Sequence, residues 1–324
     1  MTRLKYMGKT VLRLLTLLIA VSILSFLLLE ASPVDPLTAY IGTDSTLSEE
    51  AKEEIIRHWG LKEPPVTRFL KWAGNFVCGD WGESITYKKP VKTVIAERLK
   101  YSLALMLAAW LFSGILGYAF GMLAAVRQGK LTDKVIKTFS LTLQSAPVFW
   151  IGLLFLSFFA VRLGWFPIGL ATPMGKTAEE VTVFDRIYHM TLPAVTLSVL
   201  GTGKTALYTR QKFIEILNKE FILYARARGE STGQIIWRHG IRNTLMPAVT
   251  VQFASFSELF GGIALAESVF SYPGIGSALT AAGLGGDVPL LLGIAVCSAV
   301  FVFAGNLAAN LLYLVLEPRA GSFV

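Results

Sequence analysis

Residues Ser102–Val126 read SLALMLAAWLFSGILGYAFGMLAAV, a run without a single charged side chain. A helix of about 20 mostly apolar residues is long enough to cross the hydrocarbon core of a bilayer. Of the 324 residues in the whole chain, 53% are hydrophobic and 16% are charged, whereas about 25% of residues are charged in a soluble domain. The composition therefore predicts an all-α, polytopic membrane protein and disfavours a soluble two-domain enzyme.

Five further segments are apolar enough to cross a membrane, so we predict six transmembrane helices. They are Thr10–Leu29, Thr138–Val161, Leu192–Leu207, Leu245–Ala266 and Pro289–Leu316. The fourth span in chain order is the weakest, because it is short and Lys204 interrupts it. The first follows basic residues, as a signal peptide does, but its apolar run is long and no small-x-small cleavage site stands out. We therefore expect the first span to be retained.

The distribution of basic residues predicts the orientation. Short cytoplasmic loops of membrane proteins are enriched in Lys and Arg. With the N-terminus inside, the cytoplasmic segments carry 17 of the 30 Lys and Arg residues but 5 of the 22 Asp and Glu residues. We predict a multi-pass protein of the cell (inner) membrane with both termini in the cytoplasm. The positive charge then belongs to cytoplasmic loops, and no nucleic-acid partner is expected.

The predicted spans divide the chain into three parts. Residues 1–31 form a cytoplasmic segment and the first span, residues 32–100 an extracytoplasmic subdomain, and residues 101–324 a core of five spans with a cytoplasmic loop at about 208–242. In the exterior part, Thr46–Glu49 has the spacing of a capping box, which predicts a helix over Glu50–Trp59.

Two features that suggest chemistry have plainer explanations. Gly201-Thr-Gly-Lys-Thr205 resembles part of a phosphate-binding loop, but the required first glycine is replaced by Ser198 and the flanking residues are helical. The three histidines, His58, His189 and His239, are predicted to lie on different sides of the membrane. We expect no catalytic residue, no metal site and no cofactor bound by this chain.

A small-x-x-x-small pattern, Gly117-Tyr-Ala-Phe-Gly121, lies within the span quoted first. Small residues at this spacing let two helices approach closely. The sequence leaves open whether the partner helix belongs to this chain or to another subunit.

Glu258 is an acid within the fifth predicted span, where a charge is costly unless it faces a polar cavity or a partner. Either it lies on a translocation path or it is a hydrogen-bonded structural acid. Small and hydroxyl side chains surround it and leave room for a passing solute. The candidate path residues are Ser255, Ser257, Glu258, Gly261 and Gly262.

Several motifs occur in a fixed order along the chain. The cytoplasmic loop contains Tyr224-Ala-Arg-Ala-Arg-Gly229 and then Arg238-His-Gly-Ile-Arg-Asn-Thr-Leu-Met-Pro247. Glu267-Ser-Val-Phe-Ser-Tyr-Pro-Gly-Ile-Gly276 and Asp287-Val-Pro289 follow, and Gly79-Asp-Trp-Gly-Glu-Ser84 precedes the second span. This combination resembles permease subunits of binding-protein-dependent ABC importers, of the peptide/nickel branch, with the loop similar to their "EAA" loop.

The resemblance implies a type I (MetI-like) permease fold and a role for the cytoplasmic loop. A short helix of this loop is expected to sit in a cleft of an ATPase subunit, with Tyr224, Ala225, Arg226, Ala227 and Gly229 in the coupling positions. The sequence departs from the family at Glu230, where a leucine commonly follows the glycine. Further family-motif residues are Glu267, Phe270, Pro273, Gly274, Gly276, Asp287 and Pro289.

The resemblance also implies the partners: a second homologous permease, two ATP-binding subunits, an extracytoplasmic solute-binding protein and membrane lipid. ATP and Mg would be used by the partners, so this chain is not expected to be an enzyme. Short peptides are the expected substrate. Nickel or another metal chelate is the alternative, and an acid at 258 followed by Gly261 and Gly262 resembles the nickel-type members more. A channel and a membrane-embedded enzyme are less favoured.

Overall fold

The structure is a computed structural model that describes residues 3–31, 50, 53, 56, 57, 63–177 and 179–316. Side chains are described for these residues except 3–9, 200 and 309–316. The predicted capping box at Thr46–Glu49, and most of the predicted helix at Glu50–Trp59, lie outside the described residues. The division into residues 1–31, 32–100 and 101–324 stays a prediction.

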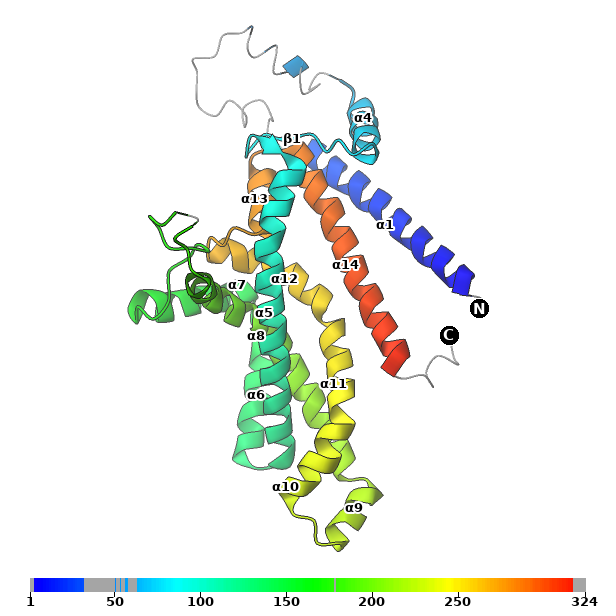
Figure 1. Ribbon diagram of the computed structural model, residues 1–324, viewed down its shortest axis with the longest axis vertical. Helices are drawn as coiled ribbons and strands as arrows, with labels where there is room; N and C mark the ends of the chain where they lie inside the picture. The colour runs from blue at the N-terminus through cyan, green and yellow to red at the C-terminus, as the bar shows by residue number, and fades with distance from the viewer. Residues whose placement is uncertain are drawn as a thin grey trace. The chain divides into compact units, whose positions relative to one another are not determined.

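The described chain is mostly helical, which confirms the predicted all-α class (Figure 1). Within the described ranges, one small sheet pairs β1 (Glu83–Ser84) with β2 (Lys89–Pro90) in antiparallel register. The helices in chain order are α1 (Arg3–Glu30), α4 (Pro65–Val77), α5 (Val91–Val126), α6 (Leu131–Ser145), α7 (Val148–Phe155), η1 (Leu156–Arg162), α8 (Val183–Leu217), α9 (Glu220–Ala227), α10 (Thr232–Ile235), η2 (Ile236–Ile241), α11 (Arg242–Ala254), α12 (Phe256–Val269), α13 (Ile275–Leu284) and α14 (Val288–Leu316).

The chain forms two compact units. The first unit comprises Met1–Tyr101 and Pro273–Phe303, and the second comprises Ser102–Tyr272 and Ala304–Val324. Helices α5 and α14 contribute residues to both units.

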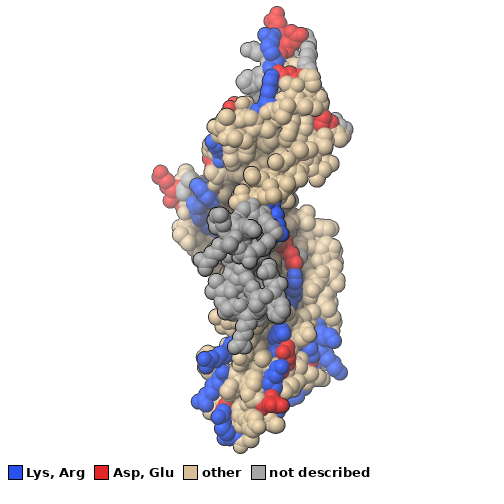
Figure 2. Space-filling view, turned by 90° about the vertical axis from the view of Figure 1, so that its right-hand side faces the viewer, with Lys and Arg blue, Asp and Glu red and all other residues tan. Residues whose placement is uncertain are grey.

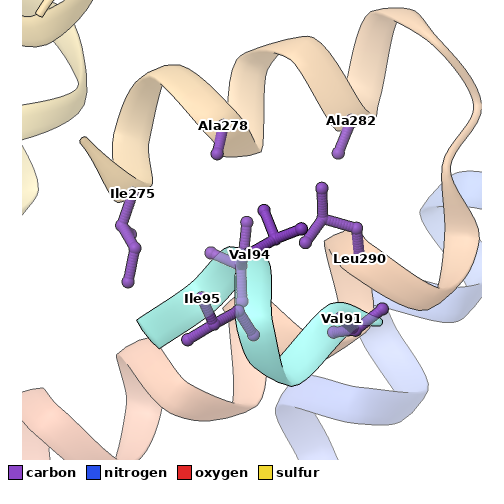
Figure 3. Close-up of a cluster of buried hydrophobic side chains, with 8 residues drawn as sticks. Val91, Val94, Ile95, Ile275, Ala278, Ala282 and Leu290 are labelled. Atoms are coloured by element: carbon purple, nitrogen blue, oxygen red, sulfur yellow. The ribbon is translucent and has the colours of Figure 1, made fainter. Parts of the chain in front are cut away.

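The core of the first unit is formed by three helices. Val91, Val94 and Ile95 at the start of α5 meet Ile275, Ala278 and Ala282 of α13 and Leu290 and Ile294 of α14, and all eight side chains are buried. Figure 3 shows the α13 side chains pointing toward those of α5. Because the two alanines of α13 are small, its backbone lies close to the valines of α5.

Among the residues that the structure describes, three unbroken helical segments are long and apolar enough to cross a membrane: Thr10–Glu30, Val91–Val126 and Val288–Ala308. They contain the first, second and most of the sixth predicted spans. The third and fifth predicted spans lie on two bent helix pairs, Leu131–Ser145 with Val148–Arg162 (110°) and Thr232–Ala254 with Phe256–Val269 (49°). The six predicted spans are therefore not all continuous helices.

Each bend has a local cause. Pro147 starts α7, and the residue before it, Ala146, is extended, as steric clash with a proline ring requires. At the second bend Ser255 ends α11, and its hydroxyl donates to the carbonyl oxygen of Gln252 at 2.8 Å. A serine that bonds to a preceding carbonyl competes with the helical ladder.

The fourth predicted span lies in α8. This helix is not one of those whose length and apolar composition suit a membrane crossing. Helices α6, α7, α11 and α12 all contact it (Figure 1). Two of its buried hydroxyl groups bond to its own backbone: Thr196 donates to the Leu192 carbonyl oxygen and Thr202 to that of Ser198, at 2.9 and 2.8 Å. The polarity of α8 is therefore accommodated among other helices.

Glycine residues set the distance between α8 and its neighbours. A Cβ atom added to Gly117 of α5 would lie 2.7 Å from the Thr205 Cβ of α8. A Cβ atom added to Gly121 would lie 2.5 Å from the Ala206 carbonyl oxygen of the same helix. The small-x-x-x-small pattern is thus an intrachain packing face, which answers the question that the sequence left open.

The glycines of the Gly201–Thr205 segment have the same function. A Cβ on Gly201 would lie 2.8 Å from the Ser113 hydroxyl of α5, and one on Gly203 would lie 2.6 Å from the Ser140 carbonyl oxygen of α6. Close helix packing therefore explains the glycines of this segment.

Replacing Gly121 with alanine should destabilise the protein. The new Cβ would overlap the backbone of α8, and overpacking of this kind costs about 1–3 kcal/mol. We expect the Gly121→Ala variant to have a lower thermal unfolding midpoint in detergent. Gly74→Ala in α4, where nothing lies within 4 Å of the added methyl, is the matched control and should not lower the midpoint. Equal midpoints for both variants would contradict the proposed α5–α8 contact.

Candidate functional site

The predicted coupling loop is a folded helical segment. Helix α9 is held by a small core in which Ile222 and Ala225 pack against Ile235 of α10, with Leu217 beside them. Ile222, Ala225 and Ile235 are buried. The orientation of α9 is therefore fixed within the loop, and one face of this helix remains open.

The open face of α9 carries most of the predicted coupling residues. Tyr224 is 70% exposed, and Arg226, Ala227 and Gly229 are also exposed. Ala225 differs, because it faces the core of the loop. Large apolar side chains accompany Tyr224 on the open surface, namely Phe221 and Leu223. An exposed aromatic and aliphatic patch on a short, fixed helix is typical of a protein interaction surface.

Gly229 ends α9 in a defined motif. Its φ angle is +83°, in the region that favours glycine. The Gly229 amide donates to the Arg226 carbonyl oxygen and the Glu230 amide to the Ala225 carbonyl oxygen, at 2.9 and 3.1 Å. These two bonds form a Schellman motif. The glycine therefore sets the direction in which the chain leaves α9.

Glu230, where the sequence departs from the family pattern, contacts two basic side chains. The Arg228 guanidinium donates to one carboxylate oxygen at 2.8 Å, and His239 Nε2 lies 3.2 Å from the other. Burial opposes ionisation of Glu230, but the bonds from His239 and Arg228 outweigh it and lower the pKa of this carboxyl. The contacts of Glu230 therefore connect the end of α9 to η2.

Basic side chains gather at the end of the second unit that holds α9 and α10 (Figure 2). Lys219, Arg226, Arg228 and Arg238 are all exposed in this region. The apolar patch of α9 is therefore flanked by positive charge.

The candidate path residues lie around the bend between α11 and α12, but they do not all share one surface. Ser255 is buried and bonded within its own turn. The Ser257 hydroxyl donates to Asn306 Oδ1 of α14 at 2.7 Å. Glu258 is exposed, and Lys204 of α8 donates to its Oε1 at 2.6 Å. Gly261 is exposed and Gly262 half-buried.

A buried polar network that sequence reasoning missed lies behind this bend. Gln252 donates to the Trp110 carbonyl oxygen and to the Ser113 hydroxyl, both at 2.7 Å, and accepts from the Thr205 hydroxyl at 2.9 Å. Its own carbonyl oxygen accepts from the Trp110 indole at 2.8 Å. The signal was a glutamine inside an apolar span. The network fixes α11 against α5 and α8, beside an apolar cavity of about 410 Å³.

A second missed feature is a buried ion pair between α6 and α8. Arg210 Nε and Nη2 donate to the two carboxylate oxygens of Asp133 at 2.5 and 2.7 Å. The Asp133 side chain is 5% exposed and also accepts from the Gly129 amide at 2.8 Å. A bidentate Arg–carboxylate pair of this kind fixes geometry. Both residues come from predicted cytoplasmic segments, whose charge indicated topology but not this pairing.

The family-motif residues of the second unit form a buried corner. Glu267 is buried and accepts from the Ser102 hydroxyl at 2.6 Å. The buried Phe270 accepts a backbone bond from Leu170 at 3.0 Å. A Cβ on Gly169 would lie 2.5 Å from that same Phe270 carbonyl oxygen. These residues support the fold around α12.

The motif residues of the first unit start two helices. Pro273 and Gly274 lead into α13, and Gly276 is buried within it. Asp287 is fully buried and precedes α14, where its Oδ1 accepts from the Leu290 amide at 3.1 Å. Its Oδ2 accepts from the Ser84 hydroxyl and the Thr86 amide of the hairpin, at 2.6 and 2.9 Å. Pro289 occupies the first turn of α14, where a proline costs no hydrogen bond.

Within the described residues, His, Cys, Asp and Glu side chains do not gather in groups of three that could hold a metal ion. Apolar helices, two bent pairs and a folded polar loop between α8 and α11 define a multi-pass membrane protein.

Comparison with known proteins gives the family. Residues 117–322 match the family described as "Binding-protein-dependent transport system inner membrane component", and the chain belongs to this family. The resemblance drawn from the sequence motifs is therefore confirmed, and the protein is a membrane component of a transport system.

Three relatives are similar over nearly their whole length. The "Oligopeptide transport system permease protein AppB" of Bacillus subtilis is 35% identical over 97% of this chain and 98% of its own. The "Probable peptide ABC transporter permease protein y4tP" of Sinorhizobium fredii is 33% identical over 97% and 99%. The "Di/tripeptide transport system permease protein DppB" of Pseudomonas aeruginosa is 31% identical over 92% and 93%.

The Glu230 contacts make the stability of the loop depend on pH. Because the pKa of Glu230 is lowered by folding, its stabilising effect is present above the ordinary glutamate pKa of about 4.3 and is lost as pH falls through the lowered value. We expect Glu230→Gln to reduce hydrogen-exchange protection of α9 amides at pH 7, and this reduction to diminish as the pH falls through the lowered pKa of Glu230. Glu179→Gln, which removes an exposed carboxylate elsewhere, should leave α9 unchanged. Equal protection of Glu230→Gln and wild type at pH 7 would refute the role of this contact.

Proposed function

We propose that this chain is the permease subunit of an ATP-driven importer of short peptides. The observation that carries the proposal is the full-length similarity to relatives whose names specify oligopeptides or di- and tripeptides. Peptides are preferred to nickel because these relatives are named for peptide transport. The resemblance of Glu258 and its following glycines to nickel-type members carries less weight than full-length similarity.

The proposed assembly pairs this chain with a second homologous permease. Two ATP-binding subunits would act from the cytoplasm, and an extracytoplasmic solute-binding protein would deliver the peptide. ATP and Mg would be used by the ATP-binding subunits, and both termini of this chain would lie in the cytoplasm. Transport would proceed by alternating access, in which ATP binding shifts the populations of inward- and outward-open states.

Helix α9 is the proposed contact with an ATP-binding subunit. Its exposed aromatic and aliphatic side chains, its fixed orientation and the flanking basic residues support this assignment. Because Ala225 packs inside the loop, the contact would be made by Tyr224, Arg226 and Ala227, with Gly229 setting the exit of the chain. A rigid loop of this kind would transmit movement of the ATPase to α8 and α11.

The transport activity is tested by reconstitution. The chain, its second permease, the ATP-binding subunits and the solute-binding protein are placed in proteoliposomes with labelled tri-alanine or labelled nickel chelate. We expect uptake of tri-alanine that requires both ATP and the binding protein. Accumulation of nickel without peptide would favour the alternative substrate, and flux without ATP would indicate a channel.

The coupling contact predicts a specific loss in the Tyr224→Ala variant. Because this side chain is 70% exposed, its removal costs little internal packing. We expect the protein to assemble normally while stimulation of ATP hydrolysis by the loaded binding protein falls about tenfold, as loss of an aromatic interface residue often produces. Met174→Ala, at an exposed side chain outside the loop, is the control. Full stimulation in Tyr224→Ala would exclude this contact.

A further inference from the structure

The ion pair between Lys204 and Glu258 differs in kind from the buried pair between Arg210 and Asp133. Lys204 Nζ donates to a single oxygen of Glu258, and the two side chains are 43% and 57% exposed. Arg210 instead engages both oxygens of a nearly buried carboxylate. Of these two pairs, the one between Arg210 and Asp133 is closed to further groups and the one between Lys204 and Glu258 is open.

The open pair retains unused bonding capacity. In the part of the chain that the structure describes, Lys204 and Glu258 have no polar side-chain partner other than each other. A lysine ammonium has three donor hydrogens, and a carboxylate accepts on both oxygens. Two donor hydrogens and the second carboxylate oxygen therefore remain available to a further group.

The surface beside the pair is open along one face of α12. Glu258, Gly261, Leu265 and Ser268 are exposed at helical spacing, whereas Leu259 and Ile263 on the opposite face are buried. A Cβ added at Gly261 would meet nothing within 4 Å. Along this face of α12, in chain order, lie a carboxylate, an open space, an apolar side chain and a hydroxyl.

A pair of opposite charges suits one class of solute. Isolated charges on membrane segments are costly, but a lysine and a glutamate neutralise each other at rest. An approaching zwitterion brings an ammonium and a carboxylate, so the pair can exchange its internal bond for two external bonds while all four charges stay paired. A solute of single charge would leave one protein group without a partner.

We propose that Lys204 and Glu258 together receive the charged termini of a peptide during its passage, with Glu258 binding the ammonium and Lys204 the carboxylate. This assignment rests on the proposed function, since it names the part of the peptide that the translocation path recognises. It adds Lys204 to the path and gives Glu258 a partner at rest. Both are specificity-determining residues of transport.

The test uses ATP-dependent uptake of tri-alanine by the reconstituted complex, with its binding protein saturated with peptide. We expect Glu258→Gln and Lys204→Met each to lower the initial rate at least about tenfold, the effect of losing one charge-assisted hydrogen bond. The double variant K204M/E258Q should be no faster than the single variants. The reversed pair K204E/E258K should recover most of the rate, because both charges are again supplied.

A structural role would give a different pattern. If the pair served only mutual neutralisation, K204M/E258Q would recover the wild-type rate, and that recovery would overturn the proposal. Basal ATP hydrolysis and subunit composition report whether each variant folds and assembles. Lys176→Met, which breaks an exposed pair with Asp185 at 2.9 Å outside the proposed path, should keep the wild-type rate.

A second variant tests the path without altering charge. Gly261→Trp fills the open space one turn from Glu258 and meets no neighbouring atom at Cβ. We expect it to slow tri-alanine uptake with the complex intact, whereas an unchanged rate would remove this face of α12 from the path. Absence of tri-alanine uptake by the wild-type complex would instead refute the proposed function.

Discussion

The second unit depends on how closely α8 approaches its neighbours. Four glycines, two on α5 and two on α8, lie at helix contacts where an added Cβ atom would be 2.5 to 2.8 Å from an atom of a neighbouring helix. That proximity allows a helix rich in threonine and serine to be covered by other helices, with the Thr196 and Thr202 hydroxyls bonded to its own carbonyl oxygens and the Thr205 hydroxyl bonded to Gln252 of α11. Without it, the same polar groups would face lipid at considerable cost. Packing, rather than hydropathy, therefore determines where α8 can lie.

Two further features become possible once α8 is fixed. Arg210, near the C-terminal end of α8, donates two hydrogen bonds to Asp133 of α6. This ion pair holds the two helices together. Lys204, nearer its middle, reaches α12 across the bend that follows Ser255. Helix α8 thus carries two basic side chains with different roles. Arg210 supports the fold, whereas Lys204 can exchange its partner. The bend matters because it brings Glu258 into the first turn of α12, where the helix dipole favours a negative charge.

Sequence analysis predicted the class well because composition and ordered motifs are global signals. It identified the membrane helices with strong apolar runs, and the motif residues around Tyr224 and Glu267 led to the correct family. It did not predict the bends, although Pro147 was visible, because a proline can either begin a span or interrupt one. It singled out Glu258 as costly but could not find Lys204 as its partner, since the two residues are 54 positions apart.

The same limit explains other features that the sequence did not reveal. Ala225 belongs to a motif whose small residues suggest a docking surface, yet its side chain faces inward because Ile222 and Ile235 need a neighbour of that size. Gln252 lies in a span that reads as apolar, and its partners come from two helices far away in the chain. Spacing predicts which face of a helix a residue shares, but not which other helix meets that face.

The hydrogen bond from Ser84 to Asp287 joins residues 203 positions apart. A ribosome releases the hairpin long before it releases the carboxylate that accepts from this hydroxyl and from the amide of Thr86. During synthesis the Ser84 hydroxyl and the Thr86 amide therefore lack this partner until Asp287, directly before the last long helix, has been added. The hairpin therefore gains these contacts only after most of the chain has been made, and a chain that stops before Asp287 lacks the carboxylate that accepts both bonds.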